Sequence, residues 1–253
     1  TTTTTMAMTT TRTITSGLSL TFHRYCFFTL LLILVSYSQS SSIVKNEEVI
    51  TVAGGCFWSI ELAFQRIPGV LSTEVGYVRS AQDDDNNSNS NSIAAALVTY
   101  EKVLKGRTGY AEAVRITFDT NLVTTNELYS FFLELHDTTK LNRQGNDVGT
   151  QYRSAIFYHT DEQHQAVIRS VQKRQSEGIT VTTEVSLVGK WHTAEKYHQQ
   201  YLAKGGQEDT KASTTPIRCY GKTRGPKKNL EHLLSNDSMS VLLGTRRNLK
   251  YEL

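Results

Sequence analysis

The feature that most constrains this chain is the stretch at residues 54–58, Gly-Gly-Cys-Phe-Trp, because the hydrophobic period changes across it. Residues 48–53 are rich in side chains that favour strands. After the stretch, apolar residues recur at roughly helical spacing until Pro68 and Gly69 end the pattern. The sequence therefore predicts a strand, a tight glycine turn and a helix, with Cys56 at the helix N-terminus.

A cysteine in that position meets backbone N–H groups and the positive end of the helix dipole, and both favour the thiolate. We therefore expect a lowered pKa for Cys56 and a role as a nucleophile, with Phe57 and Trp58 as apolar walls beside the sulfur. A cysteine in an apolar neighbourhood is more often an inert packing residue. The local sequence by itself names no reaction.

The composition excludes several classes of protein. A chain of 253 residues is long enough for one sizeable domain with extensions or for two small domains. The formal net charge of +3 provides no electrostatic basis for binding nucleic acid. The three cysteines (Cys26, Cys56 and Cys219) are too few for a disulfide-rich scaffold and form no C-x-x-C pair. We therefore expect no structural zinc site.

Residues 1–42 are predicted to be a leader. Basic residues precede the apolar run 25–35, which is too short to span a bilayer comfortably and suits the h-region of a cleaved signal peptide. Small residues follow at 36–42, and Cys26 would be removed with the leader. We expect the secretory pathway, the ER or the cell exterior as the location. A plastid, and retention of the segment as a single-pass signal anchor, are the alternatives.

Strand and helix patterns then interleave, which predicts one α/β domain (α+β, two layers) with a mixed sheet over residues 46–221. The predicted strands are 70–78, 111–119, 151–158 and 179–187, and the predicted helices are 124–135, 160–177 and 193–202. Residues 80–95, rich in Asp, Asn and Ser, are predicted to be a mobile surface loop inserted in the domain. Residues 222–253 are predicted to be a basic tail.

Glu112 falls on the apolar face of the strand 111–119, together with Val114, Ile116 and Phe118. A carboxylate on that face is partly desolvated, which raises its pKa and suits a proton donor. A strand-end glutamate that reaches solvent is the alternative interpretation.

Several segments, in this order, resemble the peptide methionine sulfoxide reductase A family. Gly-Cys-Phe-Trp at 55–58 followed by Glu61 is similar to the family signature. The other segments are 106–112 (GRTGYAE), His136-Asp137, 144–154 (QGNDVGTQYRS) and 194–202 (AEKYHQQYL). The resemblance covers roughly residues 48–221 and implies a ferredoxin-like core with long loops.

The resemblance also implies a reaction, the thiol-dependent reduction of the S epimer of methionine sulfoxide, free or in proteins. Cys56 would attack the sulfoxide sulfur, and Glu112 would bind and protonate its oxygen. Tyr100 and Tyr152 match the family's two active-site tyrosines and would add hydroxyl donors. Asp137 matches a family residue that helps to organise the site.

The product on the enzyme would be a sulfenic acid on Cys56, which a second thiol converts to a disulfide. Cys219 is the remaining candidate, and thioredoxin or a similar reductant would then recycle the enzyme. An unpaired surface cysteine is the alternative interpretation of Cys219. We expect no cofactor beyond this external thiol, a monomer, and no role in nucleic acid binding.

Three histidines, His136, His192 and His198, are not spaced as metal ligands are. We interpret them as surface residues or as structural residues whose ring nitrogens are hydrogen-bonded. Two other functions stay open at this point. The first is a cysteine hydrolase that uses Cys56 with a histidine, although the motifs place no histidine near Cys56. The second is a methionine-binding or redox-sensing module without turnover, which would be indifferent to the loss of Cys219.

Overall fold

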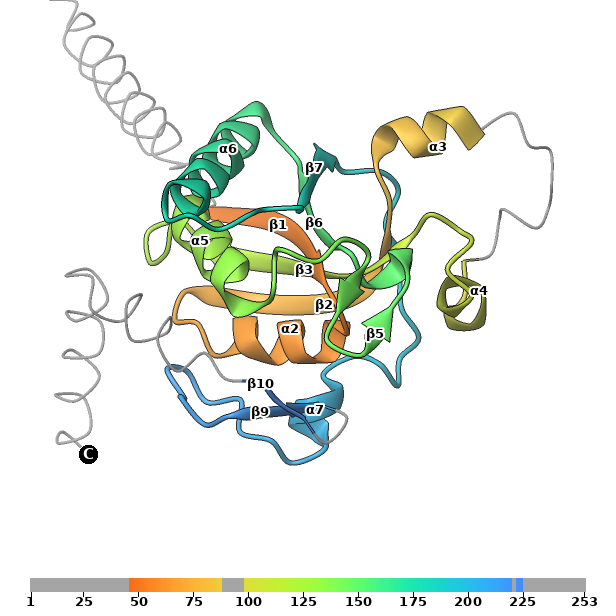
Figure 1. Cartoon of the computed structure of the whole chain (residues 1–253). Coiled ribbons are helices and arrows are strands. Elements are labelled where there is room, and N and C mark those ends of the chain that lie inside the picture. The colour runs from red at the N-terminus through yellow and green to blue at the C-terminus, as the bar shows by residue number, and fades with distance from the viewer. Residues whose placement is uncertain (1–45, 88–97, 220–221, 225–253) are drawn as a thin grey trace, which may run out of the picture. The chain divides into compact units, whose positions relative to one another are not determined.

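The computed structural model describes residues 46–87, 98–219 and 222–224 (Figure 1). The predicted leader with Cys26, part of the predicted loop 80–95 and most of the predicted tail lie outside these residues. The division into leader, domain and tail therefore stays a prediction. Among the described residues, no helix combines the length and the apolar character that crossing a bilayer requires.

A six-stranded mixed sheet forms the centre of the fold. Its strands are β1 (Glu47–Gly54), β2 (Val70–Val78), β3 (Ala111–Asp119), β6 (Ser154–Tyr158), β7 (Glu184–Leu187) and β8 (His192–Thr193). They lie in the order β7-β6-β1-β3-β2-β8, and all neighbours are antiparallel except the parallel pair β6 and β7. This confirms the mixed α/β class.

Two helices complete the core unit, α2 (Phe57–Gln65) between β1 and β2 and α5 (Thr125–Leu135) between β3 and β6. The inner strand order β6-β1-β3-β2 with these two crossovers is the βαββαβ arrangement of a ferredoxin-like core. The remaining elements are α3 (Ala81–Asn87), α4 (Tyr100–Leu104), β4 (Arg143–Gln144), β5 (Asp147–Val148), the 3₁₀ turn η2 (Thr150–Tyr152), α6 (Asp161–Ser176), α7 (Tyr201–Lys204), β9 (Ile217–Cys219) and β10 (Lys222–Arg224).

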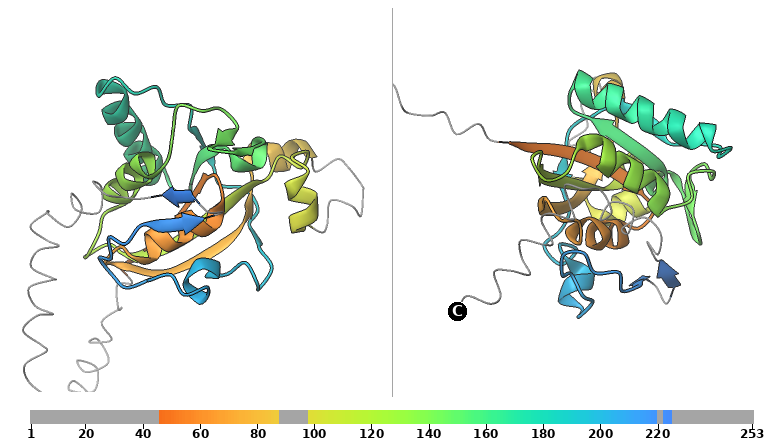
Figure 2. Two further views of the ribbon diagram at one scale, coloured as in Figure 1. Left: turned by 60° about the horizontal axis from the view of Figure 1, so that its bottom comes forward. Right: turned by 90° about the vertical axis from the view of Figure 1, so that its left-hand side faces the viewer.

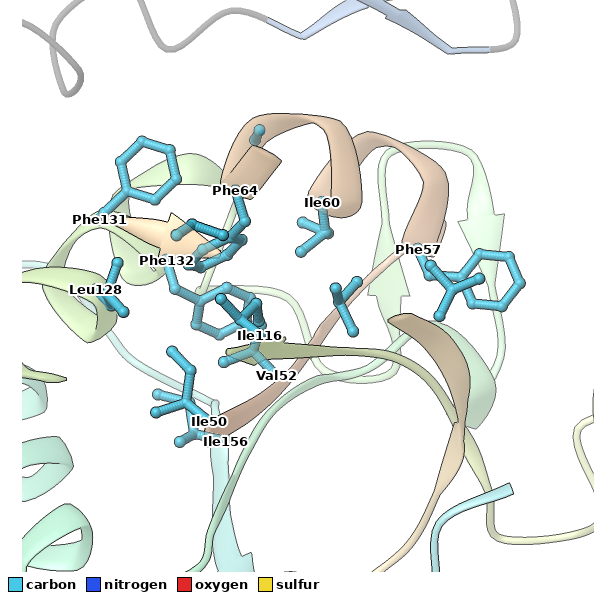
Figure 3. Close-up of a cluster of buried hydrophobic side chains, with 14 of the residues drawn as sticks. Ile50, Val52, Phe57, Ile60, Phe64, Ile116, Leu128, Phe131, Phe132 and Ile156 are labelled. Carbon is cyan, nitrogen blue, oxygen red and sulfur yellow. The ribbon is translucent and has the colours of Figure 1, made fainter. Parts of the chain in front are cut away.

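The main core lies between one face of the sheet and the two helices. Figure 3 shows Phe64 of α2 and Phe131 of α5 gathered over sheet residues such as Val52 and Ile116. The rings of Phe64 and Phe131 meet edge to face, with 5.4 Å between their centroids and 83° between their planes. Each of these side chains is at most 2 % exposed, so each contributes roughly 1.5–3 kcal/mol through burial.

The opposite face of the sheet carries a smaller cluster of mostly alanine side chains, with Val188 and Trp191 packed on it. Strand alternation separates the two faces, so that Glu112 lies on the side of the main core and its neighbours Ala111 and Ala113 on the other. Gly76 allows the Trp191 ring to pack closely on this face of the sheet, because a Cβ at position 76 would lie 2.4 Å from the ring.

Three of the predicted elements are confirmed in detail. The strands predicted at 70–78 and 111–119 are β2 and β3. The predicted capping box begins α5, since Thr124 Oγ1 accepts from the Glu127 N–H at 3.2 Å and Glu127 Oε2 accepts from the Thr124 N–H at 2.8 Å.

The prediction of a loop at 80–95 is wrong for residues 81–87, which form α3. The Ser80 hydroxyl accepts from the Asp83 N–H at 3.1 Å, and Arg79 pairs with Asp84 at 2.5 Å. These contacts stabilise a helix start that composition alone does not indicate.

The strand predicted from residue 151 begins only at Ser154, because residues 150–152 form η2. Gln151 Nε2 donates to the Leu104 carbonyl at 3.0 Å, which bends the chain away from the sheet. Gly149 permits the bend, since a Cβ there would lie 2.3 Å from Gln151 Oε1. The strand predicted at 179–187 is likewise shorter and covers only β7.

The helix predicted at 193–202 is wrong. Residues 192–193 form β8, and a helix appears only as the four residues of α7. The Gln199 side chain bonds the N–H and the carbonyl of Val75 at 2.9 and 2.8 Å. Gln200 takes a left-handed conformation with φ 55°, and its N–H donates to Glu61. These long-range bonds override the local helical pattern.

Candidate active site

Cys56 lies where the sequence predicts it, at the N-cap of α2 directly after β1. Gly55 makes the turn with φ 85°, a region that residues with a side chain rarely adopt. The Ser59 hydroxyl donates to the Cys56 carbonyl at 3.0 Å and stabilises the first turn of the helix. The cysteine is only 3 % exposed.

The expected lowering of the Cys56 pKa is wrong. The hydrogen bond with the Cys219 thiol, burial and the charge of Glu112 together raise the pKa of Cys56 well above its usual value. The backbone at Trp58 lowers it again, but this effect of the helix start is the smaller one. Desolvation disfavours the thiolate more than the helix N-terminus favours it.

Cys219, the last residue of β9, lies directly on the Cys56 thiol. Its Sγ is 3.6 Å from Cys56 Sγ, and both cysteines are buried with no disulfide between them. In Figure 2 (left) β9 crosses in front of α2, the helix that begins at Cys56. The fold thus brings into contact two thiols that are 163 positions apart in the sequence.

Glu112 lies in β3 beside these thiols and is 4 % exposed. Its Oε2 accepts from the backbone N–H of Phe57 at 3.3 Å. Burial raises the pKa of Glu112 to about 8, the charges of Asp147 and Cys219 add to this, and the bond from Phe57 opposes it. The carboxyl group is therefore protonated at neutral pH and can donate a proton.

Tyr100, at the start of α4, and Tyr152, at the end of η2, are half-buried near the same groups. Burial raises the pKa of both phenols, and the charges of Glu112 and Cys56 raise it further. The structure therefore brings both tyrosines within electrostatic range of the thiol and the carboxyl group.

The two aromatic residues after Cys56 have different surroundings. Phe57 is 1 % exposed, and its ring packs against Tyr77 and His198 with centroids 6.1 and 5.2 Å away. Trp58 is half-buried and stacks on Tyr201 at 3.9 Å. Trp58 is thus the more accessible of the two.

Asp137 is not brought to the thiols. It is exposed after α5, and its carboxylate accepts from the N–H and the hydroxyl of Thr139 at 2.9 and 2.6 Å, which lowers its pKa. The aspartate whose charge reaches both Glu112 and Tyr152 is Asp147 of β5. Asp147 lies in the same segment, 144–154, as Tyr152, and this proximity in the sequence is what could have pointed to it. Strand and helix patterns do not distinguish the two aspartates.

Glu195 is a second carboxylate that the sequence did not single out. It accepts from the Tyr77 hydroxyl at 2.8 Å and from the Tyr100 N–H at 2.9 Å. Burial alone would raise the pKa of Glu195, but these bonds lower it, so it stays charged. Because Tyr77 pairs with Glu112 across β2 and β3, Glu195 links Tyr100 to the residue opposite Glu112.

The interpretation of His198 as a surface or satisfied residue is wrong. It is 2 % exposed, and its ring packs against Phe57, Trp58 and Tyr100 at 5.2, 5.5 and 4.7 Å. Its ring nitrogens find no hydrogen-bond partner among the described residues, and burial lowers its pKa. His198 therefore packs on the two aromatic side chains that follow Cys56, but within the described chain neither a hydrogen bond nor an ion pair joins it to Cys56 itself.

The other two histidines have structural partners. His136 bonds Ser154 Oγ and the Phe132 carbonyl at 2.7 and 2.8 Å, and His192 lies 3.3 Å from the Tyr110 hydroxyl. In the part of the chain that the structure describes, no three His, Cys, Asp or Glu side chains gather as metal ligands would.

Comparisons with known proteins agree on one family. The sequence model described as peptide methionine sulfoxide reductase matches residues 48–225. The peptide methionine sulfoxide reductase of Solanum lycopersicum is 45% identical over 176 residues, which cover 67% of this chain and 83% of that protein. Peptide methionine sulfoxide reductase A2-1 of Oryza sativa subsp. japonica is 44% identical over 175 residues (69% and 87%). The Lactuca sativa relative is 45% identical, and the match spans 62% of its length.

Solved structures show the same similarity. Reduced Mxr1 from Saccharomyces cerevisiae superimposes with a TM-score of 0.56 at 32% identity, covering 64% of this chain and 87% of that one. Methionine sulfoxide reductase A of Corynebacterium diphtheriae gives a TM-score of 0.52 at 33% identity, covering 69% and 82%. The chain therefore belongs to the A-type peptide methionine sulfoxide reductase family of oxidoreductases.

Proposed function

We propose that this chain reduces the S epimer of methionine sulfoxide, free or in oxidised proteins, through a cycle of two cysteines. The observation that supports it most is the 3.6 Å contact of Cys56 and Cys219 beside the buried carboxyl group of Glu112. The predicted leader would direct this repair to the secretory pathway.

In the first step the sulfur of Cys56 attacks the sulfoxide sulfur, and Glu112 protonates the oxygen. The S–S bond formed in this attack and the S–O bond of the substrate then break as the protonated oxygen passes to the Cys56 sulfur. The sulfoxide thereby gains two electrons and becomes methionine, while Cys56 loses two and becomes a sulfenic acid. The proton that the Cys56 thiol gives up restores Glu112. Tyr100 and Tyr152 donate hydrogen bonds to the same oxygen as charge develops on it. Trp58 and Phe57 line the apolar seat of the substrate methyl group.

In the second step Cys219 Sγ attacks Cys56 Sγ, and the sulfenic oxygen leaves as water. The sulfurs need to approach from 3.6 Å to the disulfide length of about 2.05 Å. A dithiol reductant such as thioredoxin then exchanges with the disulfide and restores both thiols. The external thiol supplies the electrons, so the cycle requires no bound cofactor.

The docked position of Cys219 suits the second step rather than the first. Cys56 and Glu112 are 3 and 4 % exposed in this arrangement, which leaves a sulfoxide side chain no direct path to the thiol. Substrate entry therefore requires β9 to move away from α2. Moving it also removes the Cys219 contact that raises the pKa of Cys56.

The test is turnover of racemic methionine sulfoxide by the wild type, Cys56→Ser and Cys219→Ser, with dithiothreitol and with thioredoxin. We expect the wild type to consume half of the sulfoxide and Cys56→Ser to consume none. Cys219→Ser should stop after one turnover with thioredoxin. Absence of any sulfoxide loss in the wild type would refute the proposal.

A further inference from the structure

The resolving thiol is carried by a strand that lies outside the main sheet. β9 has three residues and pairs only with β10 in the described chain. Ile217, at the start of β9, is 1 % exposed and packs in the main core, and α2 contacts the strand. The burial of Ile217 alone does not fix the orientation of the Cys219 side chain on so short a strand. That orientation therefore depends on the other contacts of β9.

Gln207 contacts the residue next to Cys219. Its side-chain Nε2 donates to the Arg218 carbonyl at 2.6 Å, and its Oε1 accepts from the Arg218 N–H at 2.9 Å. The amide thus satisfies both backbone groups of Arg218, as a neighbouring strand would. The backbone N–H of Gln207 donates to the Leu202 carbonyl at 3.0 Å, which connects β9 to α7.

Arg66 holds the loop that leads to β9. It is the C-cap of α2 and is 1 % exposed. Its Nε and Nη2 donate to the Glu208 carbonyl at 2.8 and 2.6 Å, and its Nη1 donates to the Thr215 carbonyl. Hydrogen bonds from a charged guanidinium are stronger than neutral ones. One buried side chain therefore joins both ends of the loop 208–215.

Three further hydrogen bonds attach the same loop to the end of α2 and to the start of β2. Lys211 Nζ donates to the Gln65 carbonyl at 2.6 Å and to the Val70 carbonyl at 2.8 Å. The Arg66 carbonyl accepts from the Ala212 N–H at 2.7 Å. The loop is thus attached to the C-terminal end of the helix whose N-terminal end carries Cys56.

We propose that Gln207 and Arg66 are positioning residues for the resolving thiol. Arg66 attaches the loop 208–215 to α2, and Gln207 holds Arg218 so that the next side chain, Cys219, faces Cys56. Preorganisation of this kind accelerates an intramolecular attack by keeping the reacting atoms close and aligned. The proposal rests on the resolving role of Cys219 given above.

The test is a rapid-quench single turnover without external reductant. Methionine release reports the first step, and sulfenic acid trapped by dimedone together with free thiols reports the second. Gln207→Met keeps the side-chain length but makes neither bond to Arg218. Gln175→Met, the same change at an exposed position of α6, is the matched control.

Because losing these bonds also loosens β9, which has to leave α2 for substrate to enter, we expect Gln207→Met to release methionine at least as fast as the wild type. Disulfide formation should slow on the order of tenfold or more, given two lost hydrogen bonds, and sulfenic acid should accumulate. Gln207→Glu can still accept from the Arg218 N–H but cannot donate, so its second step should lie between those of the wild type and Gln207→Met. Arg66→Lys, which can reach fewer carbonyls, should also slow the second step selectively.

A merely structural role would slow both steps together, so equal slowing overturns the inference, as does an unchanged second step in Gln207→Met. Cys219→Ser, run in parallel, separates the two proposals. If its sulfenic acid on Cys56 disappears as fast as that of the wild type, the resolving role itself fails. If it retains the sulfenic acid while Gln207→Met behaves as the wild type, only the positioning inference fails.

Discussion

The carboxyl group of Glu112 accepts a hydrogen bond from the backbone N–H of Phe57 at 3.3 Å. This bond ties the proposed proton donor on β3 to the first residue of α2, directly after the proposed nucleophile. The donor is a backbone group, so side-chain changes at residue 57 do not remove it. Acid and thiol therefore keep their relative position through the fold itself.

Glu112→Gln should lower the rate of the first step by about 10²–10⁴, because an amide can hold the sulfoxide oxygen but cannot protonate it. The wild-type rate of this step should decline as pH rises through about 8, where Glu112 loses its proton. Methionine release in the first turnover, followed from pH 6 to 10, measures both. A Gln variant with wild-type rate would exclude Glu112 as the acid.

Cys219→Ala should lower the pKa of Cys56. It removes the hydrogen bond that is the first cause of the raised value, together with part of the burial. The pH dependence of iodoacetamide alkylation at residue 56 measures this pKa in both proteins. An unchanged or higher pKa would mean that the thiols do not dock in solution as described here.

Tyr100→Phe and Tyr152→Phe should each slow the first step, by about tenfold or more, because each loses a donor to the developing charge on oxygen. Tyr158→Phe, on β6 against His164, is the control and should leave the rate unchanged. Single-turnover methionine release measures all three. Equal rates for the control and both active-site variants would remove the tyrosines from the reaction.

Glu61→Gln should flatten the pH dependence of stability. Glu61 is 1 % exposed, and burial raises its pKa from 4.5 to about 7. Between these values the folded protein binds more protons at Glu61 than the unfolded chain, so the free energy of unfolding falls as pH rises from about 4.5 to about 7. Glutamine cannot titrate and removes this loss.

Urea unfolding at pH 5 and pH 8 measures the effect of Glu61→Gln. The fall in midpoint between the two pH values should be smaller in Glu61→Gln than in the wild type. Glu127→Gln, at the exposed capping box of α5, serves as the control, since its carboxylate is not buried. A fall as large as that of the wild type would show that Glu61 is not desolvated.

Local patterns predicted the parts of the site that depend on local structure. Strand alternation placed Glu112 on the face of the main core, and the glycine turn placed Cys56 at the start of a helix. The capping box marked Thr124 as the N-cap of α5. Each of these features depends on neighbours within a few residues, which periodicity and capping rules describe well.

The features that the sequence could not predict depend on contacts between distant segments. The raised pKa of Cys56 comes first from Cys219, 163 positions away. The left-handed conformation of Gln200 is held by Glu61, 139 positions away. The charge of Asp147, rather than that of Asp137, acts on Glu112, and the local pattern does not contain this long-range relationship.

The most direct test of the two-cysteine cycle is peptide mapping of the wild type after one equivalent of methionine sulfoxide, without reductant. The account predicts one methionine per enzyme, a mass loss of two hydrogen atoms, and a disulfide that joins the peptides of Cys56 and Cys219. Methionine release with a stable sulfenic acid on Cys56 and a free Cys219 thiol would contradict it.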